Sequence, residues 1–485
     1  VKRIMMDSVF FSFACLLVSH SLWGCSSSSS SASDSSVAVS DEVFADSVMN
    51  VLRTSLLQNV DQQKLFTDYV TVKPEVENSE LYSLIKEMPK GGLLHTHSGG
   101  FCDIRDMIDM SLKSDEAYVY WGETDGTYVK GQVAFAPTLN FLYGSNQWST
   151  NWRKMKELNA EVPDLKEQLY LLHTYGAEDK NLDTWDEFEK EFNRDWLMYD
   201  YKPMFIQSNV KALKQMADEG LQFVDLRFMT NGELYTTDGR VIGCDSIMAI
   251  YEDILKEVRK TYPYFDIRYI YCARKSQTPS DVATELKKAE DWAVTNKRII
   301  GFDLVGEEDA GNPVSAYKSV FDPSVMKLPL IMHAGETRKA TNTNVHESLL
   351  LNDQRIGHTV NLFNFPSDIA TIKSRKVVLE LCPLSNLILG YVDDLRTHPG
   401  KQYINDSISV TFSSDDNAIF RTSTITDDVF AAYTAWNLDL PTLKQCLLNS
   451  ITKTNLSSSQ EESTLKVFNK RWTEFVNGIR SKYKY

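Results

Sequence analysis

The most constraining feature of this sequence is a regular alternation of short β-rich runs with longer amphipathic stretches, which begins after Pro89. Amphipathic helical patterns such as SIMAIYEDILKEVRK and PSDVATELKKAEDWAVTN fill the intervals. Eight parallel strands that alternate with helices close into a barrel, so the pattern predicts an α/β protein with a (β/α)8 TIM-type barrel over residues 89–485. The predicted strands are 91–97, 221–228, 265–273, 298–306, 328–334, 354–360, 376–382 and 408–414.

Two segments add to this barrel. Residues 41–88 carry apolar residues at three- and four-residue spacing, as in EVFADSVMNVLRTSLL, and predict an N-terminal helical extension. The interval between His97 and Gln222 is longer than one crossover helix needs. We expect an ordered subdomain inserted after strand one, at about 115–165, because the many tyrosines and tryptophans there need a surface to pack on.

The N-terminus resembles a targeting segment. Lys2 and Arg3 precede an apolar stretch at 9–18 that is too short to span a bilayer and is typical of a signal peptide. The sequence LWGC before a serine run resembles a bacterial lipobox, although Trp23 is unusual there. This predicts a lipoprotein-type signal peptide at 1–25 that ends at a lipidated Cys25, and a flexible Ser-rich tether at 26–40.

The expected location is therefore the bacterial cell envelope, with the protein either lipid-anchored or exported. An ordinary cleaved signal peptide is the alternative. Any contact with a membrane would be made only through the lipid on Cys25.

Charge and cysteine content exclude several classes of protein. The chain has 51 basic and 66 acidic residues, a formal charge of −15, which argues against a nucleic-acid-binding surface. Its seven cysteines form no CxxC pair and show no regular spacing. Neither a disulfide scaffold nor a thiolate metal site is therefore indicated.

Two histidines end the first predicted strand, in the sequence LLHTHSGG at 93–100. Side chains alternate along a strand, so His95 and His97 lie on the same side and can share an ion. His333 and Asp415 follow predicted strands five and eight, and all these strand ends open onto one face of a barrel. Three imidazoles and one carboxylate hold a divalent ion and leave a position for water, which predicts a metal site made of His95, His97, His333 and Asp415.

Three more polar side chains lie at the same strand ends. Hydrolysis of an aromatic C–N bond needs a base near the attacking water, and His358 at the end of strand six is the candidate. It also needs an acid that delivers a proton to a ring nitrogen, and Glu336 fits if burial raises its pKa. Asp416 is placed to orient the nucleophile or to bind the substrate ring.

At this point the chain resembles the adenosine deaminase family of zinc-dependent amidohydrolases. The matching segments run in family order over most of the barrel: PKGGLLHTH (89–97), VDLRF (224–228), GFDLVGEED (301–309), MHAGE (332–336), RIGH (355–358), LELCPLSN (379–386) and SSDD (413–416). The N-terminal extension, the insertion and WDEFEKEF at 185–192 make the chain most similar to the secreted, growth-factor-like subgroup.

The resemblance implies a function and further site residues. It implies one Zn²⁺ per chain and hydrolytic deamination of adenosine or 2′-deoxyadenosine to inosine or 2′-deoxyinosine and ammonia. The small-molecule purine nucleoside would meet the backbone N–H of Gly306, and Trp185 would contact the ribose. By the same analogy the N-terminal helices form a homodimer, or they simply cover the floor of the barrel.

The sequence also departs from the family pattern. Family members commonly carry an aspartate one or two residues after the HxH motif, where Ser98 and Gly99 stand here. This puts sugar recognition in doubt, so another aminopurine such as AMP, adenine or methylthioadenosine is an alternative substrate. AMP would need a basic cluster, which the sequence does not show. The third hypothesis is an inactive growth-factor-like binding protein, which is disfavoured because all the chemical positions are intact.

The remaining polar residues have structural interpretations. We expect His173, His346 and His398 to be surface or capping residues, and Cys382 to be a small strand-end residue. Asp303 is expected in a polar layer of the barrel, with Arg227 paired to it or to another carboxylate. The acidic run EED at 307–309 is expected to be a solvated loop beside Gly306.

Overall fold

The computed structural model describes residues 32–124, 128–135, 151–176, 184–229 and 234–483. Residues 41–485 form one compact unit, and residues 1–40 form a separate unit. The predicted signal peptide with Cys25 and the first part of the tether lie outside the described residues. Helix α1 (Ala32–Asn59) begins inside the predicted tether, so residues 32–40 are helical and not an extended linker. No helix in the described part of the chain is both long and apolar enough to cross a bilayer.

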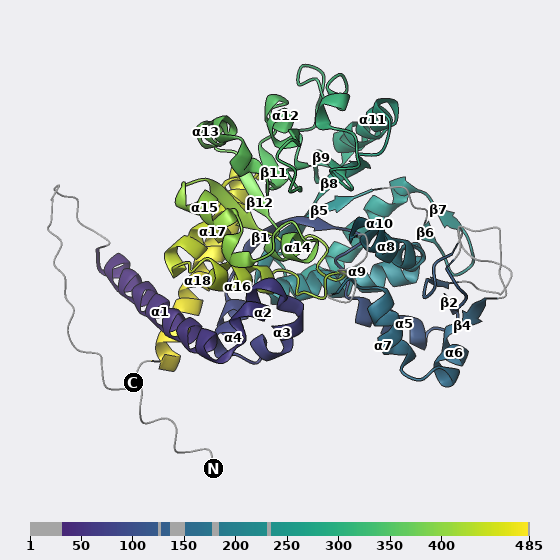
Figure 1. Cartoon of the computed structure of the whole chain (residues 1–485), viewed down its shortest axis with the longest axis horizontal. Coiled ribbons are helices and arrows are strands. Elements are labelled where there is room, and N and C mark those ends of the chain that lie inside the picture. Colours follow the sequence, from purple (N-terminus) through teal and green to yellow (C-terminus); the bar gives the residue numbers. More distant parts are fainter. Residues whose placement is uncertain (1–31, 125–127, 136–150, 177–183, 230–233, 484–485) are drawn as a thin grey trace, which may run out of the picture. The chain divides into compact units, whose positions relative to one another are not determined.

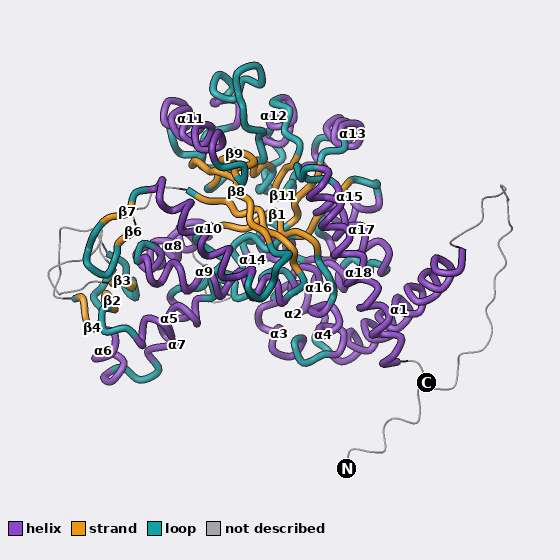
Figure 2. Tube along the Cα trace, turned by 180° about the vertical axis from the view of Figure 1, so that it is seen from behind, coloured by secondary structure: helices purple, strands orange, loops and turns teal. Residues whose placement is uncertain are grey.

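The eight predicted barrel strands are all present, which confirms the (β/α)8 fold. They are β1 (Gly91–His97), β5 (Leu221–Phe228), β8 (Asp266–Arg274), β9 (Ile299–Val305), β10 (Met332–Ala334), β11 (Arg355–His358), β12 (Val378–Leu381) and β13 (Ser409–Phe412). They form two parallel four-stranded sheets, in the orders β1-β5-β8-β9 and β10-β11-β12-β13. Figures 1 and 2 show these strands gathered inside a ring of helices.

The two sheets meet at two seams, where single parallel bridges replace a continuous ladder. Phe302 of β9 pairs with Leu330 just before β10, and Thr96 of β1 pairs with Asp415 just after β13. At the second seam Thr96 Oγ1 donates to the Asp415 carbonyl at 2.8 Å, and the Asp415 amide donates to the His95 carbonyl at 3.1 Å. The first and last strands thus meet where two predicted metal-binding segments lie.

Helices cover the outside of the barrel because the strands are buried on both faces, as is usual for parallel sheets. The helices that follow the barrel strands are α10 (Cys244–Arg259), α11 (Pro279–Thr295), α12 (Asn344–Leu350), α13 (Pro366–Arg375), α14 (Pro383–Ile388), α15 (Gly400–Asn405), α16 (Thr426–Ala435), α17 (Leu440–Thr452) and α18 (Ser458–Tyr483).

The N-terminal extension continues with α2 (Gln62–Thr67), α3 (Tyr69–Val76) and α4 (Glu80–Glu87). The hydroxyls of Tyr69 and Tyr82 donate to the buried carboxylate of Asp427 on α16, at 2.7 and 2.8 Å. The buried ammonium of Lys90 donates to the Ile85 and Lys86 carbonyls at the end of α4. These buried polar contacts fix the extension to the barrel.

The chain between β1 and β5 forms more structure than the sequence predicts. It contains α5 (Ile104–Lys113), an antiparallel sheet of β2 (Ala117–Tyr120), β3 (Val133–Phe135) and β4 (Trp152–Lys154), then α6 (Met155–Glu161), α7 (Leu165–Leu172), α8 (Thr184–Tyr199) and α9 (Lys202–Asp218). The small sheet with α6 and α7 lies to one side of the barrel (Figure 2). The insertion therefore continues beyond residue 165 and includes α8, whose amphipathic pattern resembles that of a crossover helix.

Candidate active site

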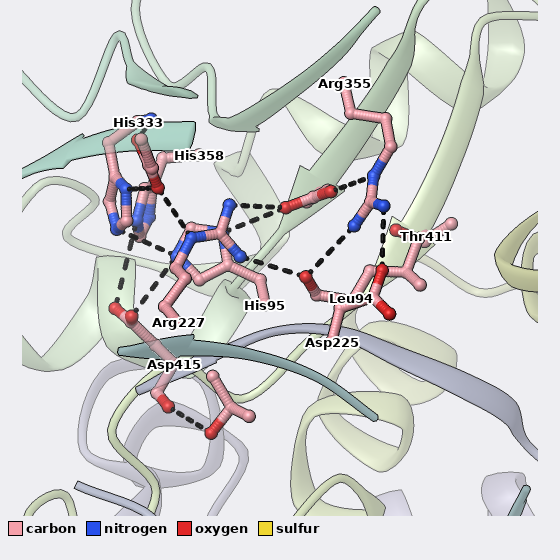
Figure 3. Close-up of polar contacts among 12 residues, drawn as sticks. Leu94, His95, Asp225, Arg227, His333, Arg355, His358, Thr411 and Asp415 are labelled. Atoms are coloured by element: carbon pink, nitrogen blue, oxygen red, sulfur yellow. Dashed lines mark hydrogen bonds and ion pairs between the residues drawn. The ribbon is translucent and has the colours of Figure 1, made fainter. Parts of the chain in front are cut away.

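The four predicted metal ligands meet at the C-terminal mouth of the barrel. Ligand atoms of His95, His97, His333 and Asp415 all lie within 4.8 Å of one another. The Nε2 atom of His333 is 2.9 Å from Nε2 of His95 and 3.2 Å from Nε2 of His97. Oδ1 of Asp415 is 3.4 and 3.1 Å from the same two nitrogens of His95 and His97. Figure 3 shows His95, His333 and Asp415 directed at one point.

The hydrogen-bond directions at this point fit a cation. Nδ1 of His333 lies 2.7 Å from the Asp303 carboxylate, and Nδ1 of His95 lies 3.2 Å from the Glu380 carboxylate. Each Nδ1 therefore carries the hydrogen, and the two Nε2 atoms present lone pairs to each other at 2.9 Å. A shared metal ion would satisfy both lone pairs, and ligand bonds of about 2.0–2.2 Å give tetrahedral edges of about 3.3–3.6 Å, slightly longer than the observed spacings of 2.9 to 3.4 Å.

A buried network of opposite charges inside the barrel holds the ligand histidines in place. Arg227 donates to Asp303 at 2.7 Å and to Glu380 at 2.9 Å, so the predicted pairing of Arg227 with Asp303 is observed together with a second partner. Burial alone would raise the pKa of Asp303, but His333 and Arg227 hold the pKa below its ordinary value. Both carboxylates therefore stay ionised and fix the imidazole tautomers.

The network continues one layer deeper. Arg355 donates to the other oxygen of Glu380 at 2.6 Å and to Asp225 at 2.7 Å, and Arg268 donates to both oxygens of Asp225 (Figure 3 labels Arg355 and Asp225). Its three cations and three carboxylates are all buried. Charge balance of this kind is what a group of ions needs in a dry core.

The predicted acid and base lie beside the ligand cluster. Oε1 of Glu336 is 3.6 Å from Nδ1 of His358, and Nε2 of His358 is 3.9 Å from Oδ2 of Asp415. Burial, and then the charge of Asp415, raise the pKa of Glu336 well above its ordinary value. A raised pKa favours the protonated form of Glu336, which is the form that its predicted role as an acid requires.

Glu308 is a site residue that sequence reasoning missed. Residues 307–309 form a loop, as expected, and Glu307 and Asp309 are partly exposed, but Glu308 is not solvated. Its side chain is buried and accepts from the amides of Gly335 at 2.8 Å and Glu336 at 2.9 Å. Lys275 lies 3.4 Å away as its buried counter-ion. Glu308 thus fixes the backbone that carries Glu336, and nothing in the sequence distinguishes it from its acidic neighbours Glu307 and Asp309.

Two glycines make room for the polar groups of the site. A Cβ at Gly100 would lie 2.0 Å from Oδ1 of Asp416, and one at Gly357 would lie 2.6 Å from the His95 ring. Asp416 is buried, and Oδ1 has no hydrogen-bond partner within the described residues. This oxygen is therefore available to a bound molecule.

A cavity opens from the ligand cluster and is walled on one side by α8. Trp185, Phe188 and Phe192 of this helix line it, at positions that repeat on one helical face. Gly306, with φ +96°, lines the cavity together with Glu336, Asp415 and Asp416. All the predicted site residues therefore line one cavity, except His95 and His358, which are fully buried.

The sequence departure at Ser98 and Gly99 has a structural counterpart. Both residues line the cavity, and a Cβ at Gly99 would lie 3.3 Å from the Phe192 ring. An aromatic edge from the inserted helix thus occupies the space beside the position where the family pattern has a carboxylate.

The three other predicted histidines differ from one another. His346 is partly exposed and pairs with Asp368 at 2.9 Å. His173 and His398 are buried, so neither is a surface residue, but both end helices, as the capping alternative predicted. His173 ends α7 and bonds Asp195 and the Gly131 carbonyl, whereas Nδ1 of His398 accepts from the Gly400 amide at the start of α15. Cys382 is buried and free, as expected of a strand-end residue.

Comparison with known proteins identifies the family of this chain. The family model for adenosine deaminase matches residues 161–470, which is more than half of the chain. "Adenosine deaminase 2" of Dictyostelium discoideum is 28% identical over 455 residues, covering 90% of this chain and 82% of that protein.

Solved structures agree in fold. An adenine deaminase from Arthrobacter aurescens superposes with a TM-score of 0.58 at 18% identity, over 80% of this chain and 99% of that chain. A zinc-bound amidohydrolase from Burkholderia ambifaria superposes with a TM-score of 0.56 at 12% identity, over 83% and 95% of the two chains. With the matched family model, these findings show that the chain belongs to the adenosine deaminase family, whose members hydrolyse C–N bonds.

Proposed function

We propose that this protein is a zinc-dependent deaminase that converts adenosine or 2′-deoxyadenosine to inosine or 2′-deoxyinosine and ammonia. The observation that carries the proposal is the pair of inward-facing Nε2 lone pairs of His95 and His333, 2.9 Å apart beside His97 and Asp415. A zinc ion bound by these four residues would supply the Lewis acidity that makes water a nucleophile at neutral pH. The zinc-bound relative of the same fold supports this choice of metal.

The chain's own groups match the proton transfers that deamination needs. Glu336 is buried with a raised pKa, so it holds the proton that a purine ring nitrogen must receive as water adds to the neighbouring carbon. Asp416 offers an unpartnered oxygen to the ring or to the leaving amine. The backbone N–H of Gly306 completes the set, since it lies in the same cavity with no side chain in the way.

The charge of the cavity favours a nucleoside over a nucleotide. Five carboxyl groups line it, from Glu189, Asp195, Glu336, Asp415 and Asp416. The cations among its described lining residues are Arg227 and Arg274, and both are already paired with carboxylates. No cation among these residues is therefore left unpaired for a phosphate, so AMP is disfavoured.

The test is a deamination screen of the zinc-loaded protein with adenosine, 2′-deoxyadenosine, adenine, AMP and methylthioadenosine, measured by ammonia release. We expect turnover of adenosine or 2′-deoxyadenosine, loss of turnover with a strong chelator, and recovery when zinc is restored. Turnover of AMP or adenine alone would replace the nucleoside with another aminopurine. A folded, metal-loaded protein that is inert toward all five compounds would refute deamination and favour a binding protein.

A further inference from the structure

A buried hydrogen-bond relay ends at His358. The Gly400 amide lies 2.9 Å from Nδ1 of His398, Nε2 of His398 lies 3.2 Å from Oδ1 of Asn386, and Nδ2 of Asn386 lies 3.1 Å from Nδ1 of His358. His398, Asn386 and His358 are each at most 2% exposed. The relay therefore runs through the interior, from the start of α15 to the edge of the metal site.

The direction of every bond in this relay follows from its first member. A backbone N–H can only donate, so Nδ1 of His398 is the acceptor and its ring hydrogen lies on Nε2. That N–H donates to the amide oxygen of Asn386, which turns the NH₂ group of Asn386 toward His358. Nδ1 of His358 must then accept, and the single ring hydrogen of His358 lies on Nε2.

The surroundings keep this arrangement in place. The His398 ring stacks on Trp436 with ring centres 5.2 Å apart. A Cβ at Gly400 would lie 3.0 Å from Nδ1 of His398 and 2.7 Å from the Trp436 ring, so only glycine allows this close approach. The carboxyl of Glu336 is the other polar group near Nδ1 of His358, and at 3.6 Å it is beyond hydrogen-bond distance.

Nε2 of His358 is the open end of the relay. It is buried and has no hydrogen-bond partner among the described residues, and it lies 3.9 Å from Oδ2 of Asp415. The backbone at His358 is left-handed, with φ 62°, which an L-residue adopts only where the surrounding structure imposes it. An N–H fixed in this position is placed to donate to an oxygen atom beside Asp415.

We propose that His398 and Asn386 are positioning residues that hold His358 in the tautomer with hydrogen on Nε2, so that His358 acts on the nucleophilic oxygen as a hydrogen-bond donor. This role differs from the base that the sequence suggested. It rests on the proposed deamination only for its effect on rate, because the position of the ring hydrogen is a property of the folded protein alone.

The first test reads the tautomer directly, by ¹⁵N NMR of the zinc-loaded protein labelled at its histidines. The His358 signals are identified by their loss in His358→Asn. We expect His358 and His398 each to show a protonated Nε2 and an unprotonated Nδ1. A protonated Nδ1 on His358 would overturn the proposal, whatever the substrate of the enzyme.

The second test reverses the last bond of the relay. Asn386→Asp keeps the shape but offers only acceptors, so the hydrogen of His358 should move to Nδ1 while His398 is unchanged. We expect kcat to fall about tenfold or more, with KM and zinc content within about twofold of the wild type. Asn352→Asp adds the same charge at an exposed turn and should leave kcat unchanged.

The outcomes separate this inference from the proposed function. An inert wild-type protein with the expected ¹⁵N signals refutes deamination but leaves the tautomer assignment intact. Full kcat in Asn386→Asp after the ring hydrogen has moved refutes the donor role while deamination stands.

Discussion

In one half of the barrel, β1, β5, β8 and β9 are seven to nine residues long, whereas in the other half β10, β11, β12 and β13 have three or four. Each half supplies two of the predicted metal ligands. The other reacting groups, Glu336, His358 and Asp416, all belong to the half with short strands. The half with long strands supplies Arg227 and Asp303, which hold ligands in place.

The difference shows that the reacting groups gather in one half, whereas the charged network that supports the ligands spans both, with Arg227 and Asp303 in the long half and Glu380 in the short half. Long ladders give the rigid side on which buried charges can be held at fixed distances. The short strands end close to the site, so the chain can leave the regular β conformation there. His358 and Asp415, whose side chains reach the site, have left-handed backbone angles, φ 62° and 57°. Such conformations cost about 1–3 kcal/mol each and cluster at functional sites. We therefore expect substitutions of the reacting groups in the short half to lower kcat, and substitutions of the supporting residues in the long half to weaken metal binding.

The largest effect is expected from Glu336→Gln, which removes the proton donor but keeps the shape. We expect kcat for adenosine to fall about 10²- to 10⁴-fold while zinc content stays near that of the wild type. Ammonia release and metal analysis measure the two quantities on the same sample. Glu347→Gln, on the outer helix α12, is the matched control, and equal activity in Glu336→Gln would refute the acid assignment.

A smaller effect, of a different kind, is expected from Asp303→Asn in the long half. The amide cannot hold the Nδ1 hydrogen of His333 as the carboxylate does at 2.7 Å, so zinc affinity should fall about 10- to 100-fold. Competition with a chromophoric chelator measures the affinity. If kcat at saturating zinc falls as far as in Glu336→Gln, the proposed division between the two halves is wrong.

Glu308→Gln tests whether a residue of the long half positions a reacting group of the short half. Glu308 follows β9, and it accepts hydrogen bonds from the amides of Gly335 and Glu336 in the loop after β10. Its NH₂ group would face one of the two amides now bound at 2.8 and 2.9 Å, so we expect kcat to fall about tenfold. The same change made in Glu336→Gln should have little further effect, because both act through one group. Equal losses in both backgrounds would instead indicate a general loss of structure.

The smallest effect is expected on the wall supplied by α8. Trp185→Phe removes the N–H that donates to the Tyr391 hydroxyl and reduces the aromatic surface, so KM should rise a few-fold, about two to five, with kcat unchanged. Asn193→Ala, at an exposed position of the same helix outside the cavity lining, is the control for general disturbance of α8. A fall in kcat without a change in KM would place Trp185 in the chemistry and not in binding.

The sequence predicted those parts of the fold and site that follow from local pattern. Strand alternation located all eight barrel strands, and the position of His95, His97, His333 and Asp415 at strand ends was enough to bring them together, because every parallel strand opens on the same face. Site residues were therefore predictable where they lie directly at the end of a barrel strand and have a side chain suited to metal binding or proton transfer.

What the sequence did not reveal depends on contacts between distant segments. In the sequence, Glu308 belongs to an acidic run that predicts an exposed loop. In the structure it is buried, where it accepts from two backbone amides and pairs with Lys275. His398 bonds the amide of Gly400 two residues away, but its role depends on Asn386, which folding brings beside it. The extent of the insertion was also missed, since the apolar face of α8 covers the cavity and not a sheet.

The seam between the first and last barrel strands has a mechanical consequence. Apart from the contacts around the Thr96–Asp415 bridge, little main-chain pairing joins β1 to β13, while His95 and His97 lie on one side of this seam and Asp415 on the other. An ion bound by these three residues would connect the two sides of this seam. Metal binding would then be coupled to closure of the barrel between β1 and β13, so that the ion needed for catalysis would also stabilise the fold.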